Sequence, residues 1–210
     1  AQAYESQRGC GRVSEIETLT LNWEGLIVPS QFKHDSDPDW LKVSAVYVCE
    51  ATYETCTVLY VGQTNDLLSR LRSHLVATVG LTYWLRDETG KWAYEPGDSY
   101  HYLSQMEPEK LERLQALARD TVQRQKWYFA PVEIEALKAV EALLIRAVKK
   151  LEQDRYLDRD RNQTTEPSII CDNGNLGMAL NSPIEVVNIG IDHMKELLGE
   201  KVRWPMKDAA

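Results

Sequence analysis

Residues 60–74 read Tyr-Val-Gly-Gln-Thr-Asn-Asp-Leu-Leu-Ser-Arg-Leu-Arg-Ser-His, the pattern of a strand that leads into a helix through a short polar link. The strand is expected over residues 57–62, where side chains alternate between two faces. Thr64 or Asn65 at the end of the link is expected to cap the helix, and Asp66 favours its first turn. The helix is expected from 67 to 76, because leucines recur at four-residue intervals, at Leu67, Leu71 and Leu75.

A second strand is expected just upstream, over residues 43–49. Val46 and Val48 would point to one face of that strand and Tyr47 to the other, since successive side chains of a strand alternate. Only a short polar segment separates it from the strand at 57–62. The two strands are therefore expected to pair as an antiparallel hairpin.

The remaining segments alternate between helical and strand patterns. Pro108 opens a charged helix that runs to about Arg124. Residues 126–131 read as a third strand, and a long helix is expected over 132–151. Outside these elements we expect an N-terminal strand or two, a hairpin tip, a polar segment, a short strand and a terminal helix, at 19–28, 86–91, 152–166, 184–189 and 191–198.

Composition limits the class of protein. The chain has 210 residues and 43% hydrophobic content, enough for one sizeable core. Its net charge of -8 argues against a protein that coats nucleic acid nonspecifically, because such proteins show a broad basic face. No long apolar stretch and no secretion leader are present, so a cytoplasmic location is expected. The cysteines lack zinc-site spacing and are expected to be reduced thiols, at Cys10, Cys49, Cys56 and Cys171.

The hairpin carries two tripeptides on adjacent strands, Ala45-Val46-Tyr47 and Tyr60-Val61-Gly62, and Arg70 and His74 follow on the next helix. This arrangement resembles the GIY-YIG nuclease superfamily, which is named for two such tripeptides. The first tripeptide departs from the family name, with alanine in place of glycine and valine in place of isoleucine. Its tyrosine is retained.

The resemblance extends to Glu141 in the long helix, where the family places its metal ligand, and to Asn162, where it places a structural asparagine. It implies an α+β fold with a small antiparallel three-stranded sheet and flanking helices. The nuclease core would cover 43–165, interrupted by an insertion at about 77–125 that we expect to contribute DNA or subunit contacts. The remaining segments would be N-terminal and C-terminal extensions, at 1–42 and 166–210.

Glu141 is also a candidate site residue by its helical spacing alone. Its neighbours at i−4, i+3, i+4 and i+7 are all apolar, namely Leu137, Leu144, Ile145 and Val148. A carboxylate beside an apolar face is costly to leave unpaired. A cation would compensate it, and Mg²⁺ or Mn²⁺ suits an oxygen ligand. The alternatives are a salt bridge to a nearby arginine or a side chain that reaches solvent.

Arg70 and His74 are four residues apart and share one helix face, which borders the leucine stripe. The planar guanidinium of an arginine fits a phosphate. A solvated arginine is the alternative, and Arg72 is expected to be one. His74 would donate to a phosphate, relay a proton or be a polar edge residue. His193, near the C-terminus, has no obvious partner in the sequence.

Tyr47 and Tyr60 lie on adjacent strands, where cross-strand tyrosines often only pack. Gly62 would permit a tight turn and a close approach of the backbone. A free phenol has a pKa of about 10, too high for a base at neutral pH. Proton transfer through Tyr47 would therefore need a neighbouring cation that lowers its pKa, or a path through water.

The resemblance implies a metal-dependent DNA endonuclease, with a small restriction-type enzyme as the best fit. Glu141 would hold one divalent cation, Mg²⁺ or Mn²⁺, and Arg70 would clamp the scissile phosphate. Tyr47 would take a proton from the attacking water, while Tyr60 and His74 complete the hydrogen bonding. The partner would be DNA, and a homodimer would allow both strands to be cut. A catalytically inactive DNA-binding or regulatory domain on the same fold, and a protein-interaction module, are the alternatives.

Overall fold

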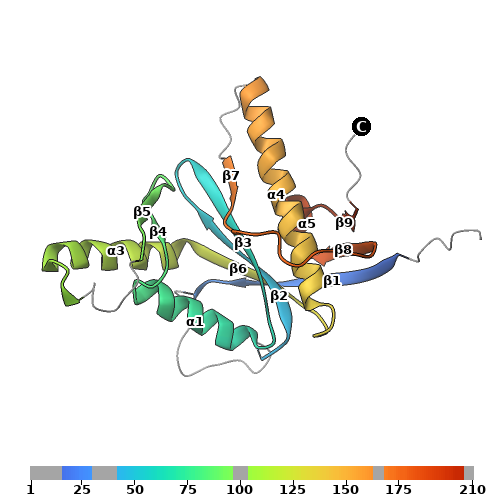
Figure 1. Ribbon diagram of the computed structural model, residues 1–210, viewed down its shortest axis with the longest axis horizontal. Helices are drawn as coiled ribbons and strands as arrows, with labels where there is room; N and C mark the ends of the chain where they lie inside the picture. The colour runs from blue at the N-terminus through green and yellow to red at the C-terminus, as the bar shows by residue number, and fades with distance from the viewer. Residues whose placement is uncertain (1–15, 30–41, 97–103, 163–167, 206–210) are drawn as a thin grey trace, which may run out of the picture.

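The computed structural model describes residues 16–29, 42–96, 104–162 and 168–205, with the side chains of the third range described as far as residue 157. The described chain forms a seven-stranded mixed sheet in the order β7-β3-β2-β6-β1-β8-β9 (Figure 1). The strands of this sheet are Glu17–Ile27 (β1), Ala45–Thr52 (β2), Cys56–Thr64 (β3), Gln125–Pro131 (β6), Ser168–Cys171 (β7), Ile184–Gly190 (β8) and Lys201–Trp204 (β9). A separate hairpin joins Leu85–Arg86 (β4) and Trp92–Tyr94 (β5). The helices are Leu67–Val79 (α1), Pro108–Arg124 (α3), Leu137–Asn162 (α4) and Asp192–Leu198 (α5).

The expectation of a small antiparallel three-stranded sheet is wrong. The predicted strands form only the β3-β2-β6 part of a sheet that continues on both sides. β1 and β8 pair in parallel from Glu17 and Ile184 onward, and β7 pairs in parallel with β3 from Ser168 and Cys56 onward. These added strands come from the segments expected to be extensions. Alternation identifies a strand with a buried face, but it carries no information about a pairing partner far away in the sequence.

The predicted hairpin is confirmed. β2 and β3 pair antiparallel without interruption from Ala45 and Thr64 to Thr52 and Thr57, which places Tyr47 opposite Gly62. β6 pairs antiparallel with the other edge of β2. β3 continues two residues beyond Gly62, so that glycine lies within the strand and does not end it.

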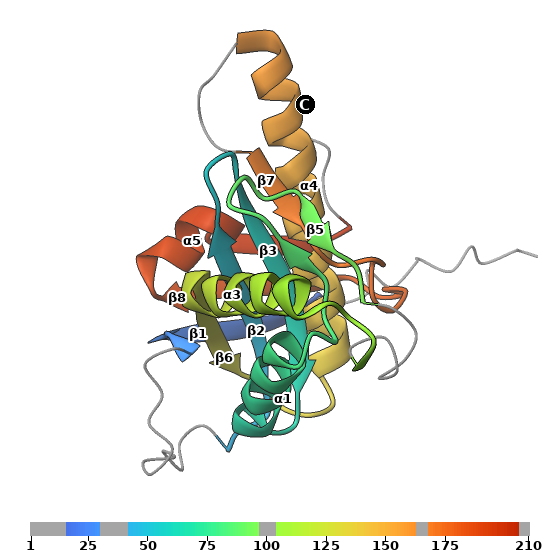
Figure 2. The same ribbon diagram turned by 90° about the vertical axis from the view of Figure 1, so that its left-hand side faces the viewer.

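The two faces of the β2-β3 hairpin pack against different helices. One face carries the valine and leucine side chains that contact α4, including Val46, Val48, Leu59 and Val61. The opposite face carries Tyr47, which packs with Leu67 and Leu71 of α1. Figure 2 shows α1 and α3 in front of the sheet and α4 behind it. A site that uses both α1 and α4 must therefore form at an end or edge of the sheet.

α1 begins at Leu67 as expected, but its N-cap is Asp66 and not the expected Thr64 or Asn65. The Asp66 carboxylate accepts a hydrogen bond from the backbone N of Ser69 at 2.9 Å. The predicted stripe of Leu67, Leu71 and Leu75 is wrong at its third residue, because Leu75 is only half-buried. The buried face of α1 instead consists of Leu67, Leu71, His74 and Thr78. The spacings between these residues, four, three and four, match the 3.6-residue helical turn more closely than repeated spacings of four would.

α4 begins later and ends later than expected. The backbone N of Val132 donates to the carbonyl of Ser44 at 3.0 Å, so strand-like pairing persists past β6 and delays the helix to Leu137. The helix then continues to Asn162, because its charged second half consists of good helix formers such as Lys, Arg, Glu and Gln.

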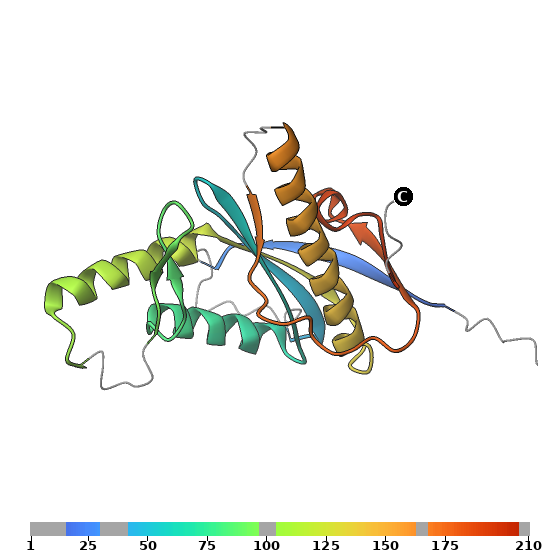
Figure 3. The same ribbon diagram turned by 45° about the horizontal axis from the view of Figure 1, so that its top comes forward.

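The predicted hairpin tip and charged helix of the 77–125 insertion are present as β4-β5 and α3. They share a small core that consists of Leu81, Leu85, Tyr94, Leu114 and Ala118. Figure 3 shows this unit at one end of the sheet, above α1. Within the described ranges, no helix combines the length and the apolar character needed to cross a bilayer.

Candidate active site

Tyr47 occupies the centre of the candidate site and is fully buried on β2. Its ring stacks on the Trp127 indole, with ring centroids 4.8 Å apart. The ring also crosses the β3 backbone at Gly62: a Cβ built there would lie 2.8 Å from Tyr47 Cε2 and closer still to Cζ and Oη. The expected close approach at Gly62 is therefore confirmed. The glycine is needed because the Tyr47 ring leaves no room for a side chain there, and not because the chain turns.

The hydroxyl of Tyr47 joins the two α1 residues that the helical spacing selected. Arg70 Nε donates to Tyr47 Oη at 2.8 Å, and His74 Nε2 lies 3.3 Å from the same oxygen. The expectation that Arg70 and His74 share a face is confirmed, and Arg72 is exposed as expected. A neutral His74 with its lone pair on Nε2 would accept the Tyr47 proton, since that hydroxyl already accepts from Arg70.

Burial keeps both partners of this hydrogen bond neutral. It raises the pKa of Tyr47 above its ordinary value, and the effect of burial is larger than the opposing effect of Arg70. It also lowers the pKa of His74 to about 4, with a further contribution from the positive charge of Arg70. The cation therefore does not lower the pKa of Tyr47 below that of a free phenol, so a resting tyrosinate is not part of this site at neutral pH.

Further aromatic rings surround His74. Tyr60 is half-buried on β3, and its ring centroid lies 5.7 Å from that of His74 and 6.2 Å from that of Tyr47. Trp127 of β6 and Tyr83 of the insertion lie 5.0 Å and 5.2 Å from His74 between centroids. Sequence reasoning placed Tyr60 here and missed Trp127 and Tyr83, although the alternation of β6 puts Trp127 on the same face as Tyr47.

Glu141 reaches the site from the other helix. It lies on α4 among the buried side chains of Leu137, Leu144, Ile145 and Val148, as its spacing predicts, and is itself half-buried. Burial raises the pKa of the Glu141 carboxyl, while a side-chain hydrogen bond from Gln63 and the charge of Arg70 oppose that rise. Gln63 is the next residue of β3 after Gly62, so the carboxylate lies near the end of β3 where Tyr47 and Arg70 also lie.

The donor set at Glu141 fits a magnesium-type ion in composition. Mg²⁺ keeps several waters and is bound in proteins through one or two carboxylates together with substrate phosphate oxygens. Glu141 supplies one half-buried carboxylate, and Gln63 supplies an amide beside it. Among the residues that the structure describes, no cluster of three or more His, Cys, Asp or Glu side chains is arranged to hold a metal.

The structure assigns a structural role to Asn173, which sequence reasoning did not select. Its amide accepts from the backbone N of Val61 at 2.9 Å and donates to the carbonyl of Val61 at 2.8 Å. The β3-β7 pairing ends at Leu59, so this side chain continues the ladder where β7 stops. The only sequence signal was the Gly/Asn-rich character of residues 172–177. Asn162 ends α4, and its side chain lies outside the described part of the chain.

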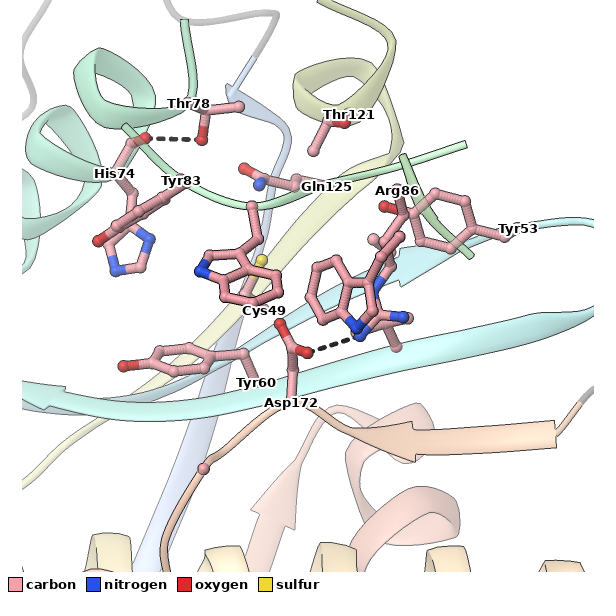
Figure 4. Close-up of a pocket in the computed structure, with 15 residues that line it drawn as sticks. Cys49, Tyr53, Tyr60, His74, Thr78, Tyr83, Arg86, Thr121, Gln125 and Asp172 are labelled. Atoms are coloured by element: carbon pink, nitrogen blue, oxygen red, sulfur yellow. Dashed lines mark hydrogen bonds and ion pairs between the residues drawn. The ribbon is translucent and has the colours of Figure 1, made fainter. Parts of the chain in front are cut away.

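A cavity of 590 Å³ adjoins the site. Tyr60 and His74 lie at one end of its lining and Arg86 lies toward the other, with Asp172 between Tyr60 and Arg86 (Figure 4). Arg86 Nη2 donates to Asp172 Oδ1 at 2.7 Å, which ties the insertion to the segment after β7. The insertion therefore forms a wall of the space next to Tyr60 and His74.

No protein-family model matches this chain, and no match was found among curated proteins or solved structures.

Proposed function

We propose that this protein is a metal-dependent DNA endonuclease that uses Tyr47, Tyr60, Arg70, His74 and Glu141. The observation that carries the proposal is the hydrogen-bonded group around Tyr47 Oη, which joins β2 to α1 through Arg70 and His74. Two helices on opposite faces of the sheet bring a guanidinium and a half-buried carboxylate to the end of the same strand. Such a pairing of cation and carboxylate suits a phosphodiester and its metal ion.

Arg70 would bind the scissile phosphate. Its guanidinium has five N–H donors, and the Tyr47 hydroxyl uses the one on Nε. The remaining donors suit the nonbridging phosphate oxygens, which gain negative charge as water attacks. The hydrogen bond to Tyr47 holds the guanidinium plane, so less side-chain freedom is lost when the phosphate binds.

Tyr47 and His74 would carry the proton released by the attacking water. As the new P–O bond forms, the P–O bond to the leaving sugar oxygen breaks and that oxygen takes a proton from solvent. The proton of the attacking water would pass to Tyr47 Oη, which must become accessible when DNA binds because Tyr47 is fully buried in the free protein. The Tyr47 proton passes to His74 Nε2, 3.3 Å away. Burial is the main cause that disfavours protonated His74, and the charge of Arg70 adds to it; a bound phosphate anion would offset the Arg70 contribution. This path requires no tyrosinate in the resting enzyme, which agrees with the raised pKa of Tyr47.

Glu141, with Gln63 beside it, would hold Mg²⁺ or Mn²⁺. The ion would supply Lewis-acid stabilisation of the phosphate and leaving oxygen. Burial raises the pKa of the Glu141 carboxyl, so a bound cation would relieve the cost of keeping that carboxylate ionised.

A plasmid-nicking assay in Mg²⁺, run alongside thermal melting, tests the proposal with Glu141→Ala. We expect cutting to be abolished while DNA binding is retained and the melting temperature is unchanged or raised, because a poorly compensated carboxylate is removed. Glu152→Gln is the control, since Glu152 is another half-buried glutamate of α4. A folded Glu141→Ala protein that cuts at the wild-type rate refutes the metal assignment.

The same assay separates the alternatives. Wild-type protein that binds DNA in EDTA but never nicks it with Mg²⁺ or Mn²⁺ is a binding or regulatory domain. If cutting is seen, sequencing the DNA ends reports whether the enzyme is of the restriction type, and sizing the DNA complex reports whether a homodimer forms. A cytoplasmic location remains a prediction, and the free thiols of Cys49, Cys56 and Cys171 agree with a reducing compartment.

A further inference from the structure

Six of the fifteen residues that line the cavity beside the candidate site carry aromatic rings. Figure 4 shows Tyr60, Tyr83 and His74 at one end and Tyr53 at the other, and the lining also includes two indoles. The indoles belong to Trp84 and Trp92 of the insertion, whose ring centroids lie 5.1 Å apart. Each of these tryptophans is 48% exposed. Part of each indole is therefore available to a flat ligand.

One of these indoles is held rigidly. The Arg86 guanidinium lies 3.5 Å from the Trp92 ring centroid, and it is itself fixed by hydrogen bonds to the Gly90 carbonyl and the Asp172 carboxylate. Arg86 is buried. A ring held in this way loses little freedom when a ligand stacks on it, which favours binding.

Polar groups are also present in the lining. The Thr78 and Thr121 hydroxyls donate to the helix carbonyls of His74 and Leu117, and each hydroxyl oxygen is also an acceptor. Gln125, which also lines the cavity (Figure 4), adds an amide that can donate. Flat aromatic faces with a few hydrogen-bonding groups are what a nucleobase requires: stacking for its rings and partners for its edge.

We propose that this cavity binds an unpaired nucleobase of the DNA strand whose phosphate lies at Arg70. The inference rests on the proposed function for its choice of ligand, because Tyr60 and His74 belong both to the candidate site and to the cavity lining. A base that leaves the stack next to the cut phosphate would enter between Tyr60 and the indoles. The volume of 590 Å³ lies within the range of about 300–1,000 Å³ typical of small-molecule sites.

The proposal has a consequence for the substrate. Extruding a base costs least when that base is mismatched, damaged or already single-stranded. The enzyme should therefore cut or bind most readily where an unpaired base adjoins the phosphate. The insertion would act in substrate choice, since Tyr83, Trp84 and Trp92 all belong to it.

Binding without chemistry tests the cavity directly. The probes are a short deoxycytidine oligonucleotide and an abasic oligonucleotide of equal length and charge, each labelled with a fluorophore and titrated in EDTA. Wild-type protein is expected to bind the deoxycytidine probe about tenfold more tightly, as stacking of a base on aromatic side chains implies. Trp92→Leu and Trp84→Leu should each reduce that preference without changing affinity for the abasic probe. Tyr156→Leu is the matched control, because Tyr156 is an aromatic residue of α4 with 67% exposure and lies outside the cavity lining.

Equal affinity of wild-type protein for the two probes overturns the cavity proposal, as does an equal loss of preference in the Tyr156→Leu control. Glu141→Ala separates this inference from the nuclease proposal, since it should lose cutting and keep the base preference. Wild-type protein that nicks plasmid but shows no base preference leaves the nuclease standing and removes the cavity. A base preference that depends on Trp92, in a protein that never cuts, supports the cavity and removes the nuclease.

Discussion

The substitution Gly62→Ala tests whether the Tyr47 ring crosses the β3 backbone as described. The added Cβ would lie 2.8 Å from Tyr47 Cε2, whereas ordinary contacts begin at 3.4 Å, so that edge of the ring must retreat by about 0.6 Å, the difference between the two distances. The hydroxyl would have to move further, because the built Cβ lies closer to Cζ and Oη. Trp127 stacks against the same ring and limits where it can go.

Two effects of known size follow from that displacement. Overpacking of a close-packed site costs about 1–3 kcal/mol of unfolding free energy. For a chain of this size, each kcal/mol lowers the melting temperature by about 2–4 °C. The Tyr47 hydroxyl also moves relative to Arg70 and His74, and a displacement of about 1 Å in a catalytic group costs roughly a hundredfold in rate. We therefore expect a folded, less stable protein whose cutting rate falls far more than its folded fraction.

The assay pairs thermal melting with plasmid nicking below the melting transition. Gly174→Ala is the melting control, because nothing lies within 4 Å of a Cβ built at Gly174. A double-mutant cycle with Tyr47→Ala isolates the clash: once the ring is gone, Gly62→Ala should cost little more. The reasoning is refuted if Gly62→Ala melts with the wild type, or if its cost is undiminished in the Tyr47→Ala background.

Three further predictions concern stability. His74 has a pKa of about 4 in the folded protein and 6.5 in the unfolded chain, so the unfolded chain binds the proton more readily. The stability that His74 contributes is therefore full above pH 6.5 and is lost as the pH falls toward 4. The free energy of unfolding of the wild type, measured in urea, should fall by about 3 kcal/mol from pH 6.5 to pH 4 through this effect. The His74→Asn variant should lack that part of the fall. Asn173→Asp keeps an acceptor for the Val61 N–H but replaces the donor to the Val61 carbonyl, so the free energy of unfolding in urea should fall by about 1–3 kcal/mol. An unchanged urea midpoint would show that the Asn173 side chain does not extend the sheet. Arg86→Met leaves the Asp172 carboxylate without its cation. Because that carboxylate is partly exposed, the free energy of unfolding should fall by a similar amount, about 1–3 kcal/mol. A variant as stable as the wild type would show that Arg86 does not hold the insertion in place.

The local elements of this protein follow from the sequence alone. Side-chain alternation predicted the β2-β3 hairpin, and the pairing of Tyr47 with Gly62 follows from its register. The leucine spacing predicted that α1 begins at Leu67, and the four-residue spacing placed Arg70 and His74 on one face. These features depend on residues near one another in the chain, so their geometry is set by backbone periodicity and local hydrogen bonding.

The partners that lie far apart in the sequence were decided by the tertiary structure. Asn173 bonds to Val61 across the β3 edge, and His193 lies 2.6 Å from the buried Glu50 carboxylate. Neither pair carries a signal in the sequence, because a polar side chain gives no indication of which distant group it will meet.

The sheet shows the same division. Periodicity indicates that β1 has a buried face, but its parallel pairing with β8 depends on how the whole chain packs. The sequence by itself determined the hairpin, the helices and the types of residue in the candidate site. Only the tertiary structure decided that seven strands join in one sheet and that the insertion closes a cavity beside Tyr60 and His74, since each arrangement minimises exposed apolar surface and unpaired backbone groups over the entire molecule.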